Sequence, residues 1–200
     1  MEKGDFLLIE LEGKDESGNV FESTKGEIAK KLYGKEGPLL VILGITPLLK
    51  GIEEEVYKMK EGEERDIILL PSKGFGFRSK ENVIVVPLSN FDRIPHVNDV
   101  VSIESNNSVK IGVVTSISSG RVLIDTNHPL AGRTTYFKIK VVKRLSTEKE
   151  KASHLLKENV KNFEEKENGF VIKDKLSEEE KEALKNLLKS YSISIPIEFE

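Results

Sequence analysis

Apolar and polar positions along the first forty residues predict strands separated by a polar loop. Phe6–Leu11 alternates imperfectly between the two types and predicts a first strand, and Val20–Phe21 begins a short second one. The polar stretch Ser23–Gly37 follows, with a helical turn around Glu27–Leu32. The apolar run Pro38–Leu43 predicts the next strand. The chain therefore opens with short strands joined by one long connection.

A short helix is predicted in the middle of the next stretch. It starts at the Thr46-Pro47 pair, since proline is tolerated in a first turn, and it ends at the Glu61-Gly62 break. Its apolar face recurs at three- and four-residue spacing, at Ile52, Val56 and Met59. Arg65–Leu70 reads as a strand that Pro71 ends, and the aromatic turn Gly74-Phe75-Gly76-Phe77 follows. No strand–helix–strand unit here is long enough to bind a nucleotide.

Residues 79–130 are rich in strand patterns and turn signals. Turns are predicted at Asn106-Asn107 and at Ser118-Ser119-Gly120. The strands between these signals are Val83–Val86, Val100–Ile103, Val109–Ile117 and Arg121–Asp125. We expect these four strands to form an antiparallel meander.

The last segment, Ser146–Glu200, predicts two capped helices and two strands. Capping boxes open the helices at Thr147 and Ser177. The apolar residues of the two predicted helix faces are Ala152, Leu155, Leu156, Val160 and Phe163, then Ala183, Leu184, Leu187, Leu188 and Tyr191. Phe170–Ile172 predicts one strand, and strict alternation from Ile193 to Phe199 predicts another. The segment carries no chemistry, so we expect a docking or dimerisation module.

Composition limits the classes of function. The net charge is −3, and no stripe of lysine and arginine stands clear of acidic neighbours, which argues against a nucleic-acid partner. No run of about 20 apolar residues predicts a membrane helix, and we expect no secretory leader before Phe6. The absence of cysteine fits a reducing cytoplasm. The three histidines, His96, His128 and His154, lack ligand spacing, so we expect no metal and no cofactor, and a structural role for His128.

Several landmarks in the same order resemble the FKBP-type peptidyl-prolyl isomerases. The family's leucine-glycine, glycine-aromatic-glutamate and proline-x-x-alanine-tyrosine-glycine motifs correspond here to Leu43-Gly44, Gly51-Ile52-Glu53 and Pro71–Gly76. Val20–Thr24 is similar to the family's phenylalanine-aspartate-serine-serine landmark, and Thr135–Val142 is similar to its final strand. The resemblance implies catalysis of X-Pro isomerisation on proline-containing polypeptides.

Residues 79–130 are inserted between the aromatic turn and the final strand of this pattern, and they narrow the resemblance to one branch. The segment where the insert ends, Asp125–Gly132, is similar to the junction of SlyD-like FKBPs, in which an inserted-in-flap domain binds unfolded chains. The long archaeal form of that branch adds a C-terminal domain. The resemblance implies an α+β fold with an FKBP-like antiparallel sheet wrapped on a short helix (1–78 and 131–145), an inserted all-β flap domain (79–130) and a small C-terminal α/β domain (146–200).

The resemblance also implies where an X-Pro bond would bind. The apolar cup carried over by motif position comprises Leu11, Phe21, Leu39, Leu48, Leu49, Ile52, Phe75 and Phe137. Glu22 stands where the family has aspartate, and the backbone N–H of Leu49 corresponds to the donor to the substrate carbonyl. The insert is expected to contact the unfolded chain through Val83, Val85 and Val101. Each assignment has an alternative from pattern alone. Leu48, Ile52 and Phe137 could be ordinary core residues, and Glu22 could be a solvated surface charge. Val83–Val86 could pack within the insert's own sheet.

Four cup positions depart from the family pattern. Leu11 and Phe75 replace tyrosines, Ile52 replaces the floor tryptophan, and Glu22 is one methylene longer than aspartate. The cup stays apolar but loses two hydroxyl groups, so we expect an active but weakened isomerase. Two classes of function stay open. One is an isomerase whose insert raises the local concentration of unfolded chain, and the other is a non-catalytic holdase chaperone on a degenerate FKBP scaffold.

Overall fold

The computed structural model describes residues 1–105 and 108–200 of the chain. These residues form two compact units. The first unit comprises Met1–Gly13, Val20–Ile67 and Phe137–Glu200, and the second comprises Lys14–Asn19 and Ile68–Tyr136. Among the described residues, no helix is long and apolar enough to cross a membrane.

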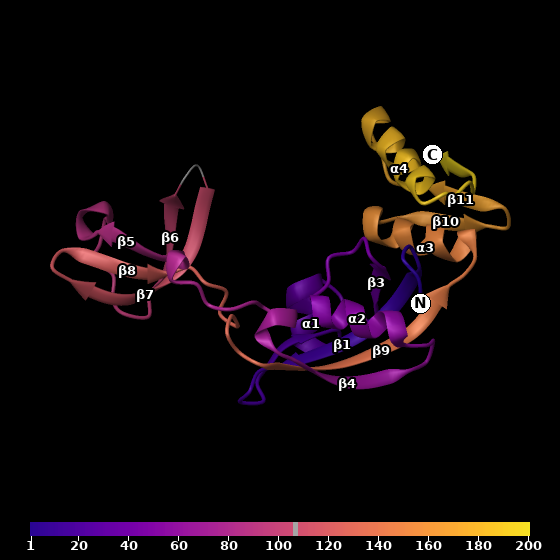
Figure 1. The fold of residues 1–200 in the computed structure, drawn as a ribbon. Coiled ribbons are helices and arrows are strands. Elements are labelled where there is room, and N and C mark those ends of the chain that lie inside the picture. Colours follow the sequence, from indigo (N-terminus) through magenta and orange to yellow (C-terminus); the bar gives the residue numbers. More distant parts are fainter. Residues whose placement is uncertain (106–107) are drawn as a thin grey trace. The chain divides into compact units, whose positions relative to one another are not determined.

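A five-stranded sheet is the framework of the fold (Figure 1). Its strands are β1 (Phe6–Lys14), β2 (Val20–Ser23), β3 (Leu39–Ile42), β4 (Glu64–Leu69) and β9 (Thr135–Leu145). The order is β2-β1-β9-β4, and β3 pairs antiparallel with β1. Alternate residues of β1 and β9 are buried, which gives the sheet one apolar face.

Two helices lie in the connections between these strands. The predicted helical turn in the polar loop is α1 (Gly26–Tyr33), and the predicted short helix is α2 (Lys50–Lys58), with Ile52 and Val56 buried. The predicted start of α2 at Thr46 is wrong. The N–H of Thr46 donates to the carbonyl of Ile42 (2.8 Å) and its hydroxyl accepts from the Ile42 N–H (2.9 Å), so Thr46 belongs to a turn that ends β3.

The second unit contains a four-stranded antiparallel sheet. Its strands are β5 (Val83–Pro87), β6 (Val100–Ser105), β7 (Ser108–Ser118) and β8 (Arg121–Asp125), in the order β5-β8-β7-β6. The last three strands form the predicted meander, but β5 pairs with β8 instead of β6. The connection over residues 88–99 is long enough to take the chain from one sheet edge to the other.

The predicted turn between β7 and β8 is confirmed, and its backbone angles explain the sequence. Ser119 and Gly120 have φ values of 50° and 72°, as a two-residue hairpin of the primed type requires. The turn predicted at Asn106-Asn107 lies outside the described residues. Three short 3-10 turns complete this unit, at Pro71–Lys73, Lys80–Asn82 and Leu88–Asn90.

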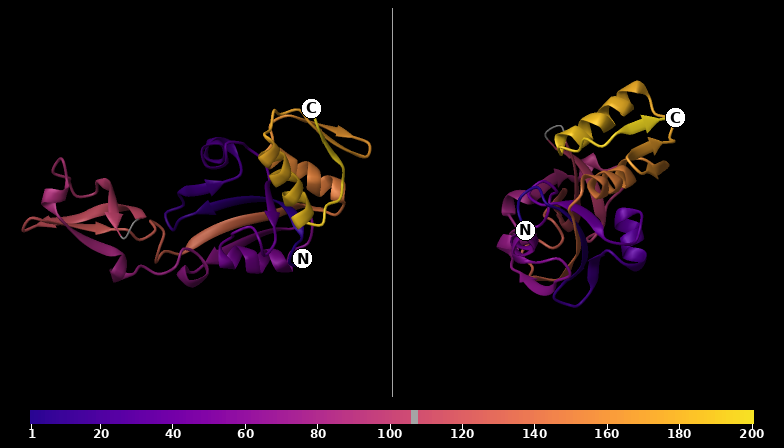
Figure 2. Two further views of the ribbon diagram at one scale, coloured as in Figure 1. Left: turned by 90° about the horizontal axis from the view of Figure 1, so that it is seen from above. Right: turned by 90° about the vertical axis from the view of Figure 1, so that its right-hand side faces the viewer.

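The C-terminal segment has the two predicted helices, α3 (Glu148–Asn159) and α4 (Glu178–Ser190). Both capping boxes are formed, at Thr147 and at Ser177. The helices lie against a sheet of β10 (Phe163–Lys166), β11 (Gly169–Ile172) and β12 (Ile197–Phe199) (Figure 2). β10 pairs antiparallel and β12 parallel with β11.

Two boundaries in this segment differ from the prediction. Phe163 lies in β10 and not on α3, because α3 ends at Asn159, whose side-chain amide donates to the Leu155 carbonyl (2.7 Å). The strand predicted from Ile193 begins only at Ile197. Ser192 has a φ of 56°, and the Ile193 N–H donates to the Leu188 carbonyl (3.0 Å), so these residues cap α4 in a Schellman arrangement.

The C-terminal segment shares its core with β1 and β3. Phe6 and Ile42 belong to the same buried cluster as residues of α3, β11 and α4, among them Leu156, Phe170 and Leu188. The Phe6 ring meets the Tyr191 ring edge to face, with centroids 5.2 Å apart. This contact explains the imperfect alternation of β1, since its first residues are covered on both faces.

We expect Phe6→Ala to destabilise the sheet and the C-terminal segment together, by about 3–5 kcal/mol, as for other buried phenylalanines. Thermal unfolding followed by circular dichroism measures the effect. Leu32→Ala is the control, since Leu32 is an exposed apolar residue and such a change costs roughly 0.5 kcal/mol or less. A separate early transition of residues 146–200 that leaves the remaining transition unchanged would contradict the shared core.

Candidate functional site

An aromatic pair lies over one glycine of β1. The rings of Phe21 and Phe137 meet edge to face with centroids 5.6 Å apart. A Cβ atom at Gly13 would lie 2.6 Å from the Phe137 ring and 2.9 Å from the Phe21 ring. Since β1 lies between β2 and β9 in the sheet, only a residue without a side chain at position 13 lets the two rings meet.

The other predicted cup residues of the first unit are apolar and at least half-buried. Leu11 and Ile52 are buried, while Leu39, Leu48 and Leu49 are half-buried. Leu11 lies two residues before Gly13 and therefore on the same face of β1. Leu48 and Leu49 immediately precede α2, the helix in which Ile52 is buried.

Leu49 offers a backbone donor at this point. It is the N-cap residue of α2, and its carbonyl accepts the N–H of Glu53 (3.0 Å). Among the described residues, none accepts a hydrogen bond from the Leu49 N–H. N-terminal amides of a helix lack partners within the helix and bind polar groups from outside.

Glu22 is paired with a residue that the sequence analysis missed. The hydroxyl of Tyr33, at the end of α1, donates a short hydrogen bond to Oε1 of Glu22. Burial, and then the neighbouring carboxylate, raise the pKa of Tyr33 well above its usual range, so the phenol keeps its proton. No motif marks Tyr33. It is the only tyrosine of the loop Ser23–Gly37, which directly follows Glu22, and this position is the one sequence signal that could have suggested it as a partner.

Phe75 belongs to the second unit, with the loop that follows the turn Pro71–Lys73. It is half-buried, and its ring is stacked on the ring of His128, with centroids 4.5 Å apart. Its neighbour Phe77 is 72% exposed.

The predicted contact residues of the insert take different positions in its sheet. Val101 packs inward on a cluster with Ile103 and Val114. Val85 faces outward and is 52% exposed, while Val83 on the same face of β5 is half-buried. The inward and outward residues of the insert could be separated only once the strand register was known.

One face of this sheet exposes a group of apolar side chains, which we name the outer apolar face. Val100 of β6, opposite Val113 of β7, is 70% exposed, and Ile111 is 69% exposed. Val85 lies opposite Leu123. The outer apolar face comprises Val85, Val100, Val109, Ile111, Val113 and Leu123.

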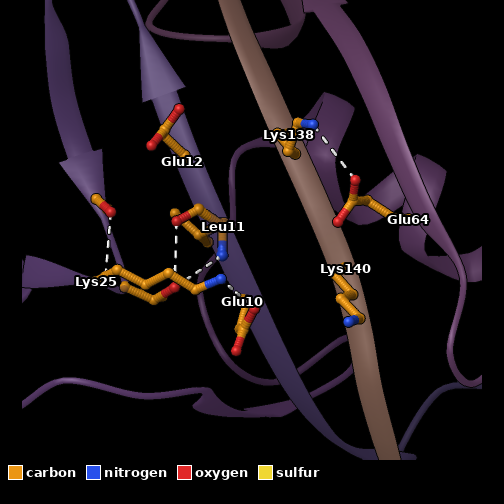
Figure 3. Close-up of a pocket in the computed structure, with 9 residues that line it drawn as sticks. Glu10, Leu11, Glu12, Lys25, Glu64, Lys138 and Lys140 are labelled. Carbon is orange, nitrogen blue, oxygen red and sulfur yellow. Dashed lines mark hydrogen bonds and ion pairs between the residues drawn. The ribbon is translucent and has the colours of Figure 1, made fainter.

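A small hollow on the face of the five-stranded sheet that carries Glu10, opposite the buried face with Leu11, is lined by charged side chains (Figure 3). It has a volume of about 80 Å³. Lys138 pairs with Glu64 (3.3 Å), and Lys25 pairs with Glu10 (2.8 Å), which raises the pKa of Lys25. These charges neutralise one another at a solvated surface, and Glu10 alternates with the inward-facing Leu11. The hollow is therefore not a candidate site. No group of acidic and histidine side chains suited to a metal ion occurs in the described part of the chain.

Comparison with known proteins identifies the family. Residues 1–91 match the model of the FKBP-type peptidyl-prolyl cis-trans isomerases. The chain is 33% identical over 153 residues to a short-type peptidyl-prolyl cis-trans isomerase of Methanocaldococcus jannaschii, covering 70% of this chain and 92% of the relative. It is 30% identical over 154 residues to the FKBP-type isomerase SlyD of Helicobacter pylori, covering 74% and 77%.

A third relative is a probable FKBP-type 16 kDa peptidyl-prolyl cis-trans isomerase of Pseudomonas fluorescens, 31% identical over 119 residues, which cover 58% of this chain and 79% of the relative. These matches confirm the predicted family, enzyme class and FKBP fold of mixed helices and antiparallel sheets. The chain belongs to the FKBP-type peptidyl-prolyl cis-trans isomerases, in their SlyD-like branch.

Proposed function

We propose that this protein accelerates cis–trans isomerisation of X-Pro bonds during protein folding. The observation that carries the proposal is the Phe21–Phe137 pair over Gly13, in the unit that also buries the apolar residues Leu11 and Ile52. The proposed cup also includes Leu39, Leu48 and Leu49 of the same unit. Phe75 is proposed to contact the proline as well, because of its place in the family motif.

The reaction needs an environment and a donor, and no nucleophile. Rotation about an X-Pro bond breaks amide resonance, and the barrier for a peptide bond is about 18–20 kcal/mol. The planar amide carries more charge separation than the twisted one, so apolar surroundings favour the transition state over the ground state. The Leu49 N–H, which has no acceptor among the described residues, would bind the carbonyl that precedes the proline and orient the bond.

The Glu22–Tyr33 pair would form a polar edge to the cup. Glu22 directly follows Phe21 in β2, and the Tyr33 hydroxyl restricts its carboxylate. Compared with the family pattern, the cup lacks two hydroxyl groups, at Leu11 and Phe75. Tyr33 supplies one phenol from a different element, the helix α1, and its hydroxyl donates to the Glu22 carboxylate. We still propose reduced activity, because Phe75 offers the substrate no hydroxyl.

The insert is proposed to bind unfolded segments through the outer apolar face. Large exposed apolar patches mark binding surfaces, and its residues lie opposite one another on neighbouring strands. Strands β5 and β6 are the edges of this sheet, so an extended client could add backbone hydrogen bonds with little sequence preference. In this proposal residues 79–130 form a chaperone domain, and a bound chain reaches the cup at a raised effective concentration.

The remaining parts of the proposal concern domains and surroundings. Residues 1–78 and 131–145 would form the isomerase domain, and residues 146–200 a C-terminal domain of the long archaeal type. A dimer contact through that domain stays a prediction. The apolar faces of α3 and α4 are already buried in the core that includes Phe6, so such a contact would use other surfaces of the domain. We propose a cytoplasmic location, because a chain without cysteine forms no disulfide and so fits a reducing compartment.

Phe75→Ala should lower kcat/KM on a proline tetrapeptide about 10- to 100-fold, since contact with a phenyl ring is worth roughly 1.5–3 kcal/mol. A protease-free isomerisation assay measures kcat/KM, and it also distinguishes an isomerase from a non-catalytic holdase. Phe77→Ala is the matched control, because Phe77 is the exposed aromatic residue of the same loop. Phe75→Tyr should raise activity. Equal rates for Phe75→Ala and the unchanged protein would place the site elsewhere.

Tyr33→Phe should lower kcat/KM several-fold, because the Glu22 carboxylate loses its donor. In an ultraviolet titration the variant should also lose the tyrosine that ionises far above the usual range. Because burial, and then the bond to Glu22, raise the folded-state pKa of Tyr33, the folded state favours the protonated phenol, and the stability present below the unfolded value near 10 is lost as the pH rises beyond it. Tyr136→Phe, at an exposed position, is the control. Unchanged activity and an unchanged titration in Tyr33→Phe would refute the proposed edge.

Ile111→Glu should weaken binding of a permanently unfolded protein about tenfold, since a buried isoleucine contributes roughly 1.5–3 kcal/mol. Its activity on a tetrapeptide should not change, while its acceleration of a proline-limited refolding reaction should fall. Ser89→Glu, at an exposed polar position in the turn Leu88–Asn90 outside this sheet, is the control. Chemical-shift mapping with the unfolded protein gives the location, and perturbations that spare the outer apolar face would contradict client binding there.

A further inference from the structure

The junction Asp125–Gly132 gives Phe75 a specific neighbour. The rings of Phe75 and His128 are stacked almost in parallel, with planes inclined by 9° and centroids 4.5 Å apart. We propose that His128 is a positioning residue for the isomerase reaction, which holds the Phe75 ring in the orientation that contacts the substrate. The proposal rests on the proposed function, since it requires Phe75 to contact the proline.

The backbone around Phe75 does not fix its ring without such a partner. Phe75 lies between Gly74 and Gly76, and Gly76 has a φ of 76°, a conformation that residues with side chains rarely adopt. The Gly76 N–H donates to the Pro71 carbonyl (2.8 Å), which closes the loop. Glycine on both sides leaves the unbound loop many conformations, so contacts of the ring itself must select one.

The ring of His128 is fixed by its own turn. The N–H of Leu130 donates to Nδ1 of His128 (3.1 Å), and the N–H of Ala131 donates to the His128 carbonyl (2.9 Å). Pro129 further restricts the backbone of His128. A flat ring is thus presented to Phe75 in a defined orientation.

The two chain segments that carry these rings are tied together. We name residues 76–79 and 125–132 the neck. The Gly132 N–H donates to the Gly76 carbonyl (2.8 Å). The Asn127 side chain accepts from the Ser79 N–H (2.9 Å) and donates to the Ser79 carbonyl (2.9 Å), and Arg78 forms an ion pair with Asp125. The stack between Phe75 and His128 therefore continues a row of contacts that joins the same two segments.

His128 is exposed, so its ring fills no core and its replacement should not unfold the protein. An exposed, locally fixed ring against a half-buried loop phenylalanine fits positioning better than packing. His128→Phe keeps a flat ring for the stack but removes the Nδ1 acceptor, whereas His128→Ala removes both. The pair of variants separates the stack from the turn.

The experiment measures kcat and KM of the full chain on a proline tetrapeptide, together with the ring-proton chemical shifts of Phe75. We expect His128→Ala to lower kcat/KM about 2- to 12-fold, the range that one aromatic pair supports. The loss should arise mainly from a higher KM, and the Phe75 ring signals should move toward random-coil values. His128→Phe should restore both readouts. His96→Ala, at an exposed histidine of the same unit, should match the unchanged protein.

Unchanged kcat/KM and unchanged Phe75 signals in His128→Ala would overturn the proposal. Equal impairment of His128→Ala and His128→Phe would also overturn it, since the loss would then come from the turn and not from the stack. Full activity of Phe75→Ala would instead refute the proposed role of Phe75 and this inference with it. If Phe75→Ala is impaired while His128→Ala is fully active, only the positioning role fails.

Discussion

The edge-to-face contact of Phe21 with Phe137 depends on a missing side chain. The two rings come from strands on either side of β1, and Gly13 is the residue of β1 beneath them. Even the methyl group of alanine would lie 2.6 Å from the Phe137 ring, closer than packed carbon atoms approach. The apolar surface that an X-Pro bond would need is therefore made by neighbouring strands around a gap in the middle one.

The strand that leaves this gap also serves two other surfaces. Near its start, Phe6 and Leu8 turn away from the cup side and join the core of the C-terminal segment. Further along, Glu10 faces solvent and pairs with Lys25. One face of β1 thus changes from the apolar Phe6 and Leu8, which pack on the C-terminal segment, to the charged Glu10. The C-terminal segment is consequently tied to the stability of the strand that carries Leu11 and Gly13.

Sequence patterns predicted the elements whose signals are local. Capping boxes marked both C-terminal helices, and Ser119-Gly120 marked a hairpin, because each depends on a few adjacent residues. The start of α2 was placed too early because Thr46 can also close a turn through Ile42. The pairing of β5 with β8 depends on contacts distant in sequence, which alternation does not encode. The family motif predicts the apolar cup positions, since their order along the chain is itself the signal.

Sequence analysis missed the contacts of Tyr33 and His128 for a common reason. Each acts through a partner distant in sequence, Glu22 for one and Phe75 for the other, and neither spacing is a motif. Each ring contacts a residue that the family resemblance proposes for the site.

The division of these residues between the two units has a mechanistic consequence. Phe21 and Phe137 belong to the first unit, whereas Phe75 belongs to the unit that also carries the outer apolar face. Within that unit, His128 and the neck connect the Phe75 loop to the end of β8, where Asp125 pairs with Arg78. A client that bound to the outer apolar face, as proposed, would therefore be bound to the same compact body as Phe75. Any effect of client binding on this body can reach Phe75 through hydrogen bonds and a ring stack, without a change in Phe21 or Phe137.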